Sequence, residues 1–425
     1  MKQYLFPAKI LLPDLPINDT EAWRKWATIA CDQFTSEPEY WESVKKTVGD
    51  APSTLSLILP EVYLDRRDEL APRIHEKMEE LLSSVLKNRN GEGMIYLSRT
   101  QSDGEVREGI VARIDLEDYS YDKGSTSVIR ATEGTVLERI PPRVAVRRGA
   151  ALELPHVMLL IDDPAFTVIE PIGRGSDAYE TAYDFDLMLG GGHVTGKWIP
   201  SDLFPQIEHA LEALITKEAL ATRYGSRDIA PLLFAVGDGN HSLASAKAHY
   251  EEIKAEIGDA AAATHPARYA LCEIVNLHSE ALRFEPIYRV VFGADKADLL
   301  AALGAYASDK SRPRNDRTQR ITWISDGETG EITVKNPTSM LPVGSLQSFL
   351  DGYMKEHPAV TIDYIHGEDA LASLSKNGAC GFLFSGMEKS ELFPTVIYDG
   401  ALPRKTFSMG HARDKRYYLE ARKIR

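Results

Sequence analysis

The residues best suited to chemistry lie in one hexapeptide, Gly237–Ser242 (GDGNHS), which follows the apolar run 231–236. The run predicts a buried strand, and a helix is expected from 243 to about 257. Two glycines around Asp238 permit a tight turn with positive φ. A helix that starts here offers N–H groups from Asn240 onward and the positive end of its dipole. The succession of strand, turn and helix therefore predicts a binding site for phosphate or another anion.

Each side chain of this loop has a candidate role. His241 could donate a hydrogen bond to a phosphoryl oxygen or move a proton near neutral pH. Asp238 could hold a metal ion such as Mg²⁺ or orient His241. The other loop residues would cradle the phosphate: Gly237, Gly239, Asn240 and Ser242. The loop lacks the third glycine of a dinucleotide fingerprint. A helix cap with a hydrogen-bonded histidine is the alternative that the residues alone leave open.

A second group of candidates follows a short apolar stretch near residue 129. Glu133, beside Gly134, could act as a general base or a metal ligand. Arg130 and Arg143 could grip a phosphate with two hydrogen bonds each. A solvated sheet edge of alternating charge is the competing interpretation.

Two further segments carry secondary candidates. Gly191–Lys197 matches the GxxxxGK half of a P-loop, but Trp198 replaces the Ser/Thr that would hold magnesium. The segment could therefore be a glycine-rich active-site loop that carries His193 and Lys197, or an exposed turn. The segment 402–411 is basic in an acidic chain, and could form a second anion clamp. Lys405 would bind the phosphate there, with Ser408 and His411 as secondary candidates, and an exposed basic tail is the alternative.

Composition limits the class of protein. The chain has 425 residues, 43% of them hydrophobic and 26% charged, as is typical of a globular protein. The net charge of −14 argues against a basic nucleic-acid-binding surface. Cys31, Cys272 and Cys380 lie too far apart for a disulfide framework or a cysteine-rich zinc site. The prolines of the N-terminal segment interrupt any signal peptide, and no apolar run could cross a bilayer, so a cytoplasmic protein is expected.

The chain is expected to be mixed α/β with three parts: 1–90, a helical and extended segment; 91–300, the core with the loop; and 301–425, a C-terminal α/β domain. Helices are expected over 65–88 and 201–224. The main strand predictions are 94–97, 106–114, 128–130, 143–147, 157–161, 321–324, 331–334 and 396–398.

Several ordered blocks together resemble one family. The blocks are Phe6–Ala8, Ala30–Gln33, Ile129–Glu133, Pro155–Pro164, Asp238–Ser242, Phe284–Val291 and Pro403–Ser408. They resemble the domain-of-unknown-function family 1015, often labelled ParB/Spo0J-like, in its branch with a DGNHS box. Ser242 stands where many relatives have arginine. Tyr288 precedes Arg289, a further candidate, where many have histidine.

The resemblance implies a core like that of the ParB, sulfiredoxin and free-serine-kinase group, with a mixed sheet. Members of that group bind nucleotide phosphates, and the kinase phosphorylates serine. The resemblance thus implies a phosphotransferase or phosphatase acting on a serine-like hydroxy or amino acid or its phosphate ester, with Mg²⁺ and ADP or ATP as candidate cofactors. The alternatives are a nucleotide-binding regulatory module without turnover and a scaffold whose ancestral site has decayed.

The expected partner is a small molecule that bears a phosphate or carboxylate. No helix-turn-helix with a basic recognition face is evident, which argues further against nucleic acid. Membrane association is not expected, and the sequence leaves a homo-oligomer open.

Overall fold

The computed structural model describes residues 2–309, 311 and 317–425, which form two compact units. The first unit comprises the chain up to Ala131, Thr135–Leu282 and Gly410–Arg425, and the second comprises Thr132–Gly134 and Arg283–Met409. This division differs from the expected parts 1–90, 91–300 and 301–425. The chain leaves the first unit twice, over Thr132–Gly134 and over Arg283–Met409, and returns to it each time, so no single cut separates the units.

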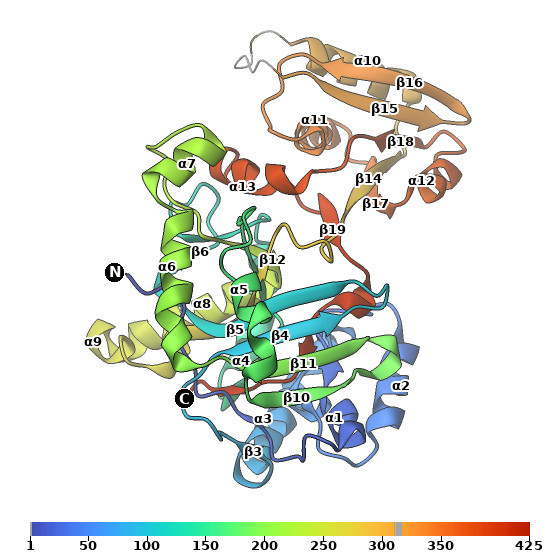
Figure 1. Ribbon diagram of the computed structural model, residues 1–425. Helices are drawn as coiled ribbons and strands as arrows, with labels where there is room; N and C mark the ends of the chain where they lie inside the picture. The colour runs from blue at the N-terminus through green and yellow to red at the C-terminus, as the bar shows by residue number, and fades with distance from the viewer. Residues whose placement is uncertain (1, 310, 312–316) are drawn as a thin grey trace. The chain divides into compact units, whose positions relative to one another are not determined.

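The first unit is built on a nine-stranded mixed sheet, in the order β10-β11-β4-β5-β13-β9-β12-β7-β6 (Figure 1). The strands are β4 Ile95–Thr100, β5 Val106–Asp115, β6 Tyr119–Ser120, β7 Ile129–Ala131, β9 Met158–Ile161, β10 Thr181–Asp186, β11 His193–Trp198, β12 Phe234–Asp238 and β13 Tyr269–Asn276. Strands β13 and β9 are parallel, as are β12 and β7, whereas β12 and β9 are antiparallel. The expected mixed α/β class is confirmed.

Side-chain alternation divides the apolar residues of this sheet between two clusters. Ile95 and Val111 belong to one cluster, and the neighbouring Tyr96 and Ile110 belong to the other, as the two-residue period of a strand requires. Burial on both faces explains why central strands such as β9 read as continuous apolar runs.

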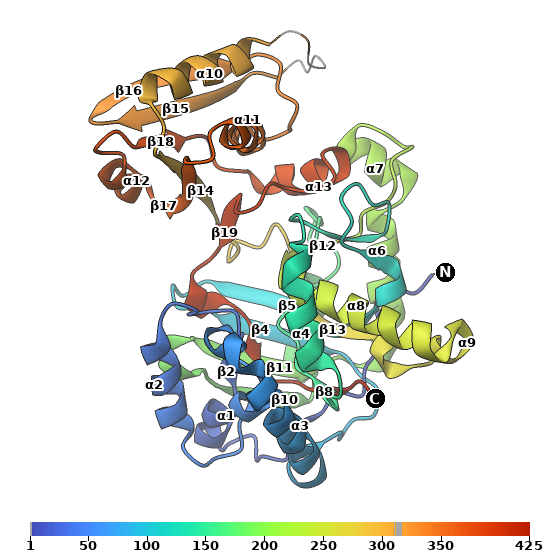
Figure 2. The ribbon, with the colours of Figure 1, turned by 180° about the vertical axis from the view of Figure 1, so that it is seen from behind.

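Helices cover the two faces of this sheet. They are α1 Thr20–Trp26, α2 Pro38–Val48, α3 Arg67–Ser84, α4 Ile140–Arg147, α5 Glu170–Arg174, α6 Phe204–Leu214, α7 Lys217–Tyr224, α8 Asn240–Ile257 and α9 Asp259–Ala262. The first cluster includes side chains of α1, α2 and α3, which are nearer the viewer in Figure 2. The second includes side chains of α5, α6 and α8.

Two sequence predictions in this unit are wrong. The alternating stretch 143–147, predicted as a strand, belongs to helix α4. Pro141 and Pro142 occupy its first turn, where proline favours a helix, and Ile140 and Val144 are buried four residues apart. The single helix predicted over 201–224 is divided, because the Thr216 side chain accepts a hydrogen bond from the Ala219 N–H and starts α7.

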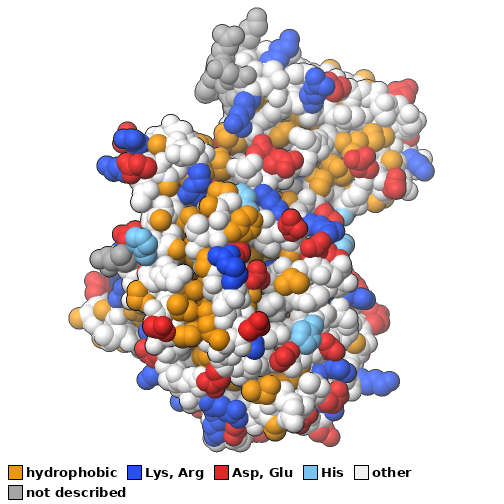
Figure 3. Space-filling view, viewed as in Figure 1, with side chains coloured by type: hydrophobic (Ala, Val, Ile, Leu, Met, Phe, Trp, Pro, Cys, Tyr) orange, Lys and Arg blue, Asp and Glu red, His pale blue; other side chains and the backbone are white. Residues whose placement is uncertain are grey.

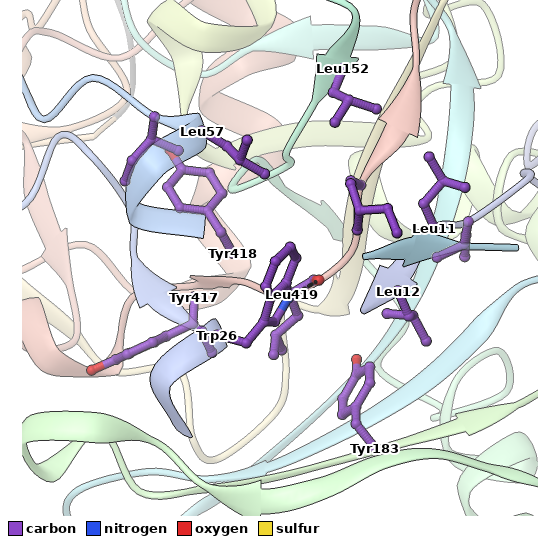
Figure 4. Close-up of a cluster of buried hydrophobic side chains, with 14 of the residues drawn as sticks. Leu11, Leu12, Trp26, Leu57, Leu152, Tyr183, Tyr417, Tyr418 and Leu419 are labelled. Carbon is purple, nitrogen blue, oxygen red and sulfur yellow. Dashed lines mark hydrogen bonds between the residues drawn. The ribbon is translucent and has the colours of Figure 1, made fainter. Parts of the chain in front are cut away.

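The C-terminal segment 410–425 pairs with strands of the first unit that are distant in the sequence. Its strand β20 Tyr417–Tyr418 pairs with β2 Thr28–Ile29, and β21 Arg422–Lys423 pairs with β8 Leu152–Glu153. Figure 4 shows Tyr417, Tyr418 and Leu419 among the buried side chains of the first cluster. The indole N–H of Trp26 donates to the Leu419 carbonyl at 2.8 Å.

A buried network of charges holds this segment to the sheet. Glu273 of β13 is fully buried and accepts from Arg107 at 3.0 Å and from Arg416 at 2.6 Å. Arg416 also donates to Glu420 at 2.5 Å, and Glu420 accepts from the Tyr183 hydroxyl at 2.6 Å. Burial alone would raise the pKa of Glu273, but the two guanidinium groups hold it below its usual value.

The second unit contains a sheet in the order β16-β15-β18-β14-β17, with β19 paired to β14. Its strands are β14 Phe284–Phe292, β15 Gln319–Ser325, β16 Glu328–Val334, β17 Thr361–His366, β18 Cys380–Leu383 and β19 Phe407–Met409. Its helices are α10 Lys296–Ser308, α11 Pro342–Glu356, α12 Glu368–Leu374 and α13 Lys389–Tyr398. The predicted hairpin near Asp326 is confirmed. The strand predicted over 396–398 is wrong: these residues end α13, whose start is fixed by a capping box between Glu388 and Glu391.

The surface is mixed in charge on the face that Figure 3 shows, where Lys and Arg are interspersed with Asp and Glu. Among the described residues, none of the helices combines the length and apolarity needed to cross a bilayer.

Replacing Glu273 with glutamine should destabilise the protein strongly. The Glu273→Gln change keeps the shape but leaves Arg107, which is 1% exposed, without a carboxylate. Breaking a buried ion pair in this way costs about 3–5 kcal/mol of unfolding free energy. Urea denaturation of the variant and the wild type measures this loss of unfolding free energy. The control Glu42→Gln, in the exposed pair with Lys45, should leave the midpoint unchanged. A wild-type midpoint for Glu273→Gln would contradict the role of the network.

His249 of α8 should make stability pH-dependent. Burial, followed by the charge of Arg147, lowers its pKa from 6.5 to about 4. Below pH 6.5 the unfolded chain therefore binds a proton that the folded chain refuses, so stability falls as pH falls from 6.5 toward 4. The loss is on the order of 2 kcal/mol at pH 5. Thermal unfolding of His249→Phe should show a smaller decline between pH 7 and 5 than wild type, whereas exposed His209→Gln should not. Equal declines would refute this assignment.

Candidate functional site

The turn between β12 and α8 has the geometry that the sequence predicts. Gly239 has φ +80°, in the left-handed region, and α8 begins at Asn240. A Cβ at Gly239 would lie 3.0 Å from Cγ2 of Val157, so the position needs glycine for both conformation and space. Gly237 serves packing, because a Cβ there would lie 2.7 Å from Cγ of Leu160 on β9.

Asp238 forms an ion pair with a lysine from the C-terminal segment. Its Oδ2 lies 3.1 Å from Nζ of Lys415, and the two side chains are only 18% and 13% exposed. Asp238 Oδ1 also accepts from the Gly239 N–H at 3.0 Å. The pair therefore places the Lys415 ammonium group, with its charge balanced by Asp238, near the N-terminal end of α8, where the helix dipole is positive.

His156 links two hydroxyl groups at the same place. Its Nε2 lies 2.9 Å from Oγ of Ser242, and its Nδ1 lies 2.7 Å from the Tyr418 hydroxyl. The Tyr418 oxygen also accepts from the Cys31 N–H at 3.2 Å. His156 is 5% exposed, so these contacts fix the plane and position of the imidazole.

Asp32 completes the cluster. Its Oδ2 lies 3.8 Å from Nε2 of His156. Burial alone would raise the pKa of Asp32, but His156, a hydrogen bond from Gln33 and the charge of Lys415 together hold it below its usual value. The neighbouring thiol is different, since burial and then Asp32 raise the pKa of Cys31 to about 12. Cys31 is therefore protonated at neutral pH and is a poor nucleophile.

The hexapeptide residues thus meet partners from two other segments, as well as from the adjoining strand and helix. Ser242 contacts His156 and Asp238 contacts Lys415. Asn240 Nδ2 donates to the Val236 carbonyl at 3.5 Å, and the His241 carbonyl accepts from Oγ of Ser245 at 2.7 Å. The His241 side chain is partly exposed.

The two arginine candidates of this unit already bind protein groups. Arg130 is buried and donates to the carbonyls of Ser127, Ala230 and Pro231 at 2.7 to 3.0 Å. Burial lowers its pKa. Arg143 pairs with Glu61 and lines a cavity of about 190 Å³, whose wall also includes Ser242, His156 and Tyr418.

His193 and Lys197 lie on a strand, β11, and not in the glycine-rich loop that the sequence predicts. The ring nitrogens of His193 lie 2.8 Å from carboxylate oxygens of Asp184 and Asp186. Lys197 donates to the Thr181 hydroxyl at 3.0 Å. His411 is exposed, before a short 3₁₀ turn. None of these contacts involves the Asp238–Lys415 pair.

Four candidates belong to the second unit: Glu133, Arg289, Lys405 and Ser408. Arg289 is fully buried, donates to the carbonyls of Ile287, Arg404 and Lys405, and lies over the Tyr364 ring. The backbone of Glu133 forms an isolated parallel β-bridge with that of Leu402. Ser408 lies opposite Glu285 in the sheet, and Lys405 is exposed.

The chemistry of the cluster suits magnesium only in part. Within the described part of the chain, no group of three or more His, Cys, Asp or Glu side chains is placed to hold a metal ion. Mg²⁺ is commonly held by one or two carboxylates together with substrate phosphates. Asp238 offers one such carboxylate, which is paired with Lys415.

The residues that sequence reasoning missed are His156, Asp32, Lys415 and Tyr418. Two of them fall in blocks that carried the family resemblance, Ala30–Gln33 and Pro155–Pro164. That signal placed the blocks in one family but gave no sign that they meet. Lys415 lies just beyond the basic segment 402–411, and only its contact with Asp238 distinguishes it from other lysines.

Comparison with known proteins now adds to this geometry. The family model "Protein of unknown function (DUF1015)" matches residues 15–353. The chain belongs to this family. The resemblance seen in the sequence is confirmed, and the family's description assigns no activity. None of the curated proteins matches the chain.

Some solved structures share a weak likeness with this DUF1015 member. A conserved hypothetical protein from Pyrococcus furiosus has 11% identity and a TM-score of 0.35, covering 74% of this chain and 95% of that one. A free serine kinase variant in complex with AMP has 11% identity and a TM-score of 0.38, covering 73% and 90%. SbnI from Staphylococcus aureus, truncated at its C-terminus, has 10% identity and a TM-score of 0.35, covering 71% and 82%. At these TM-scores the likenesses support no conclusion about what this chain does.

Substituting Gly239 should show how closely the loop fits its surroundings. Gly239→Ala incurs about 1–2 kcal/mol for the left-handed conformation and also pushes against Val157. Gly225→Ala is the matched control, since Gly225 has φ +78° but open space around it. We expect Gly239→Ala to lose clearly more unfolding free energy in urea than Gly225→Ala. Equal losses would mean that the loop can move away from Val157 freely.

Proposed function

We propose that the protein is a phosphotransferase or phosphatase that acts on a small hydroxy or amino acid, such as serine, or on its phosphate ester. The observation that carries the proposal is the Asp238–Lys415 pair, 3.1 Å apart, at the turn that opens α8. A phosphoryl group at this turn would meet the positive end of the helix and a cation held in place by Asp238.

Electrostatics is the main requirement of phosphoryl transfer. Charge spreads over the phosphoryl oxygens in the transition state, so fixed positive groups stabilise it more than mobile ones do. Lys415 is held by its pair, and its backbone carbonyl accepts from the buried Arg99 at 2.5 Å. Gly239 would let the backbone approach the phosphate closely, as expected from the sequence.

A positioned imidazole could move the proton. His156 lies between Ser242 and Tyr418, and Oδ2 of Asp32 lies 3.8 Å from its Nε2. A substrate hydroxyl or a water molecule that approaches the phosphate at α8 would pass its proton to this ring, directly or through Ser242. His241, the histidine expected from the sequence, remains a candidate beside it.

Asp238 is the residue that would hold Mg²⁺, which would neutralise phosphate charge when bound. ADP or ATP is the proposed phosphoryl donor for a kinase reaction. The proposal assigns no role to Arg130 or Arg289, whose donors are used by carbonyl groups. Glu133 and Lys405 belong to the second unit and stay outside the proposed site.

Turnover of the full chain tests the proposal. The protein with Mg²⁺ is assayed for phosphate release from phosphoserine, and for phosphoserine formation from serine with ADP or ATP. We expect Lys415→Met to lower kcat/KM roughly ten- to hundredfold, as loss of a charged hydrogen bond to phosphate would. His156→Gln should lower kcat with a smaller effect on KM, because it removes proton transfer rather than binding.

The control is Lys45→Met, which removes a lysine from an exposed ion pair with Glu42. It should match wild type. Full activity in Lys415→Met would refute the site. Nucleotide binding without any turnover would favour the regulatory module instead.

A further inference from the structure

The cavity of about 190 Å³ beside the first turns of α8 has a largely aliphatic wall. Its aliphatic lining includes Leu57, Leu59, Leu64, Met78, Leu152 and Leu154. An aliphatic cavity of about 150 Å³ is known to hold a molecule the size of benzene. This space therefore suits a branched aliphatic or aromatic group, and nothing in the phosphoryl-transfer proposal requires it.

Two ion pairs line the same cavity, the more buried Arg147–Glu153 and the more exposed Arg143–Glu61. Arg143 of α4 pairs with Glu61, and their side chains are 16% and 23% exposed. Each residue is anchored: Arg143 Nη1 donates to the Arg139 carbonyl at 2.8 Å, and the Glu61 N–H donates to the Cys31 carbonyl at 2.8 Å. A half-buried ion pair of this kind gives little net stability, because desolvation offsets its attraction.

We propose that this cavity binds a zwitterionic α-amino acid with an apolar side chain. The carboxylate would pair with Arg143, the ammonium group with Glu61, and the side chain would fill the aliphatic part. The ligand exchanges one ion pair within the protein for two across the site, while its side chain leaves water. This binding goes beyond the proposed phosphoryl transfer and does not need the Asp238–Lys415 pair.

Charge complementarity disfavours the other ligand classes. A phosphate or dicarboxylate at Arg143 would bring a second negative charge close to Glu61. A simple hydrocarbon would contact the aliphatic wall but would offer no charged group to Arg143 or Glu61. The hydroxyls of Ser242 and Tyr418, at another part of the wall, are already bonded to His156.

Calorimetric titration of the full chain, without Mg²⁺ or phosphate, tests this inference. L-Leucine or L-phenylalanine should bind with a Kd below about 1 mM. 3-Phenylpropionate, which lacks the ammonium group, and phenethylamine, which lacks the carboxylate, should each bind at least about tenfold more weakly than phenylalanine. L-Serine, which lacks the apolar side chain, should also bind more weakly.

Variants locate the site. Arg143→Gln and Glu61→Gln should each weaken binding of the better amino acid at least about tenfold. Arg148→Gln, in the exposed pair with Glu252, should bind as wild type does. Lys415→Met should also bind normally, which separates this inference from the phosphoryl-transfer proposal. Failure of both amino acids to bind, equal binding of the two analogues, or unchanged binding by Arg143→Gln would overturn it.

Discussion

The arrangement of the first unit depends on one buried carboxylate. Glu273, in the middle of β13, lies between Arg107 of β5 and Arg416 of the C-terminal segment. A charge in this position is tolerated only with both partners in place, since an unpaired ion in the interior is strongly unfavourable. The constraint therefore selects one register of the C-terminal segment against the sheet.

That register fixes the candidate site. Arg107 also donates to the Asp414 carbonyl at 2.8 Å, directly before Lys415, and Arg416 donates to the Pro155 carbonyl at 3.1 Å, directly before His156. The same charges thus position the cation at Asp238 and the loop that carries the imidazole. Support of this kind holds the side chains of the candidate site in position, at the expense of several desolvated guanidinium groups.

Local features could be predicted from the sequence, and features that depend on distant segments could not. The strand, turn and helix around Gly239 follow from an apolar run, a glycine and a helical stretch that are adjacent in the chain. The family could also be recognised, because ordered blocks survive in linear sequence. The strand prediction for 143–147 was wrong because it relied on alternation, whereas the preceding prolines favour the start of a helix. The sequence around His156 and Lys415 does not mark them as site residues, because they join the site only through their contacts with Ser242 and Asp238.

The path of the chain has a consequence for biosynthesis. Lys415 and Tyr418 reach the site only after the second unit has been made, because the segment 410–425 follows it in the chain. While that segment is still inside the ribosomal exit tunnel, the emerging polypeptide has no partner for Asp238 and leaves β2 and β8 without their neighbours. Closure of the first unit must then pair Tyr417–Tyr418 with Thr28–Ile29, a step of high sequence separation that is expected to be slow.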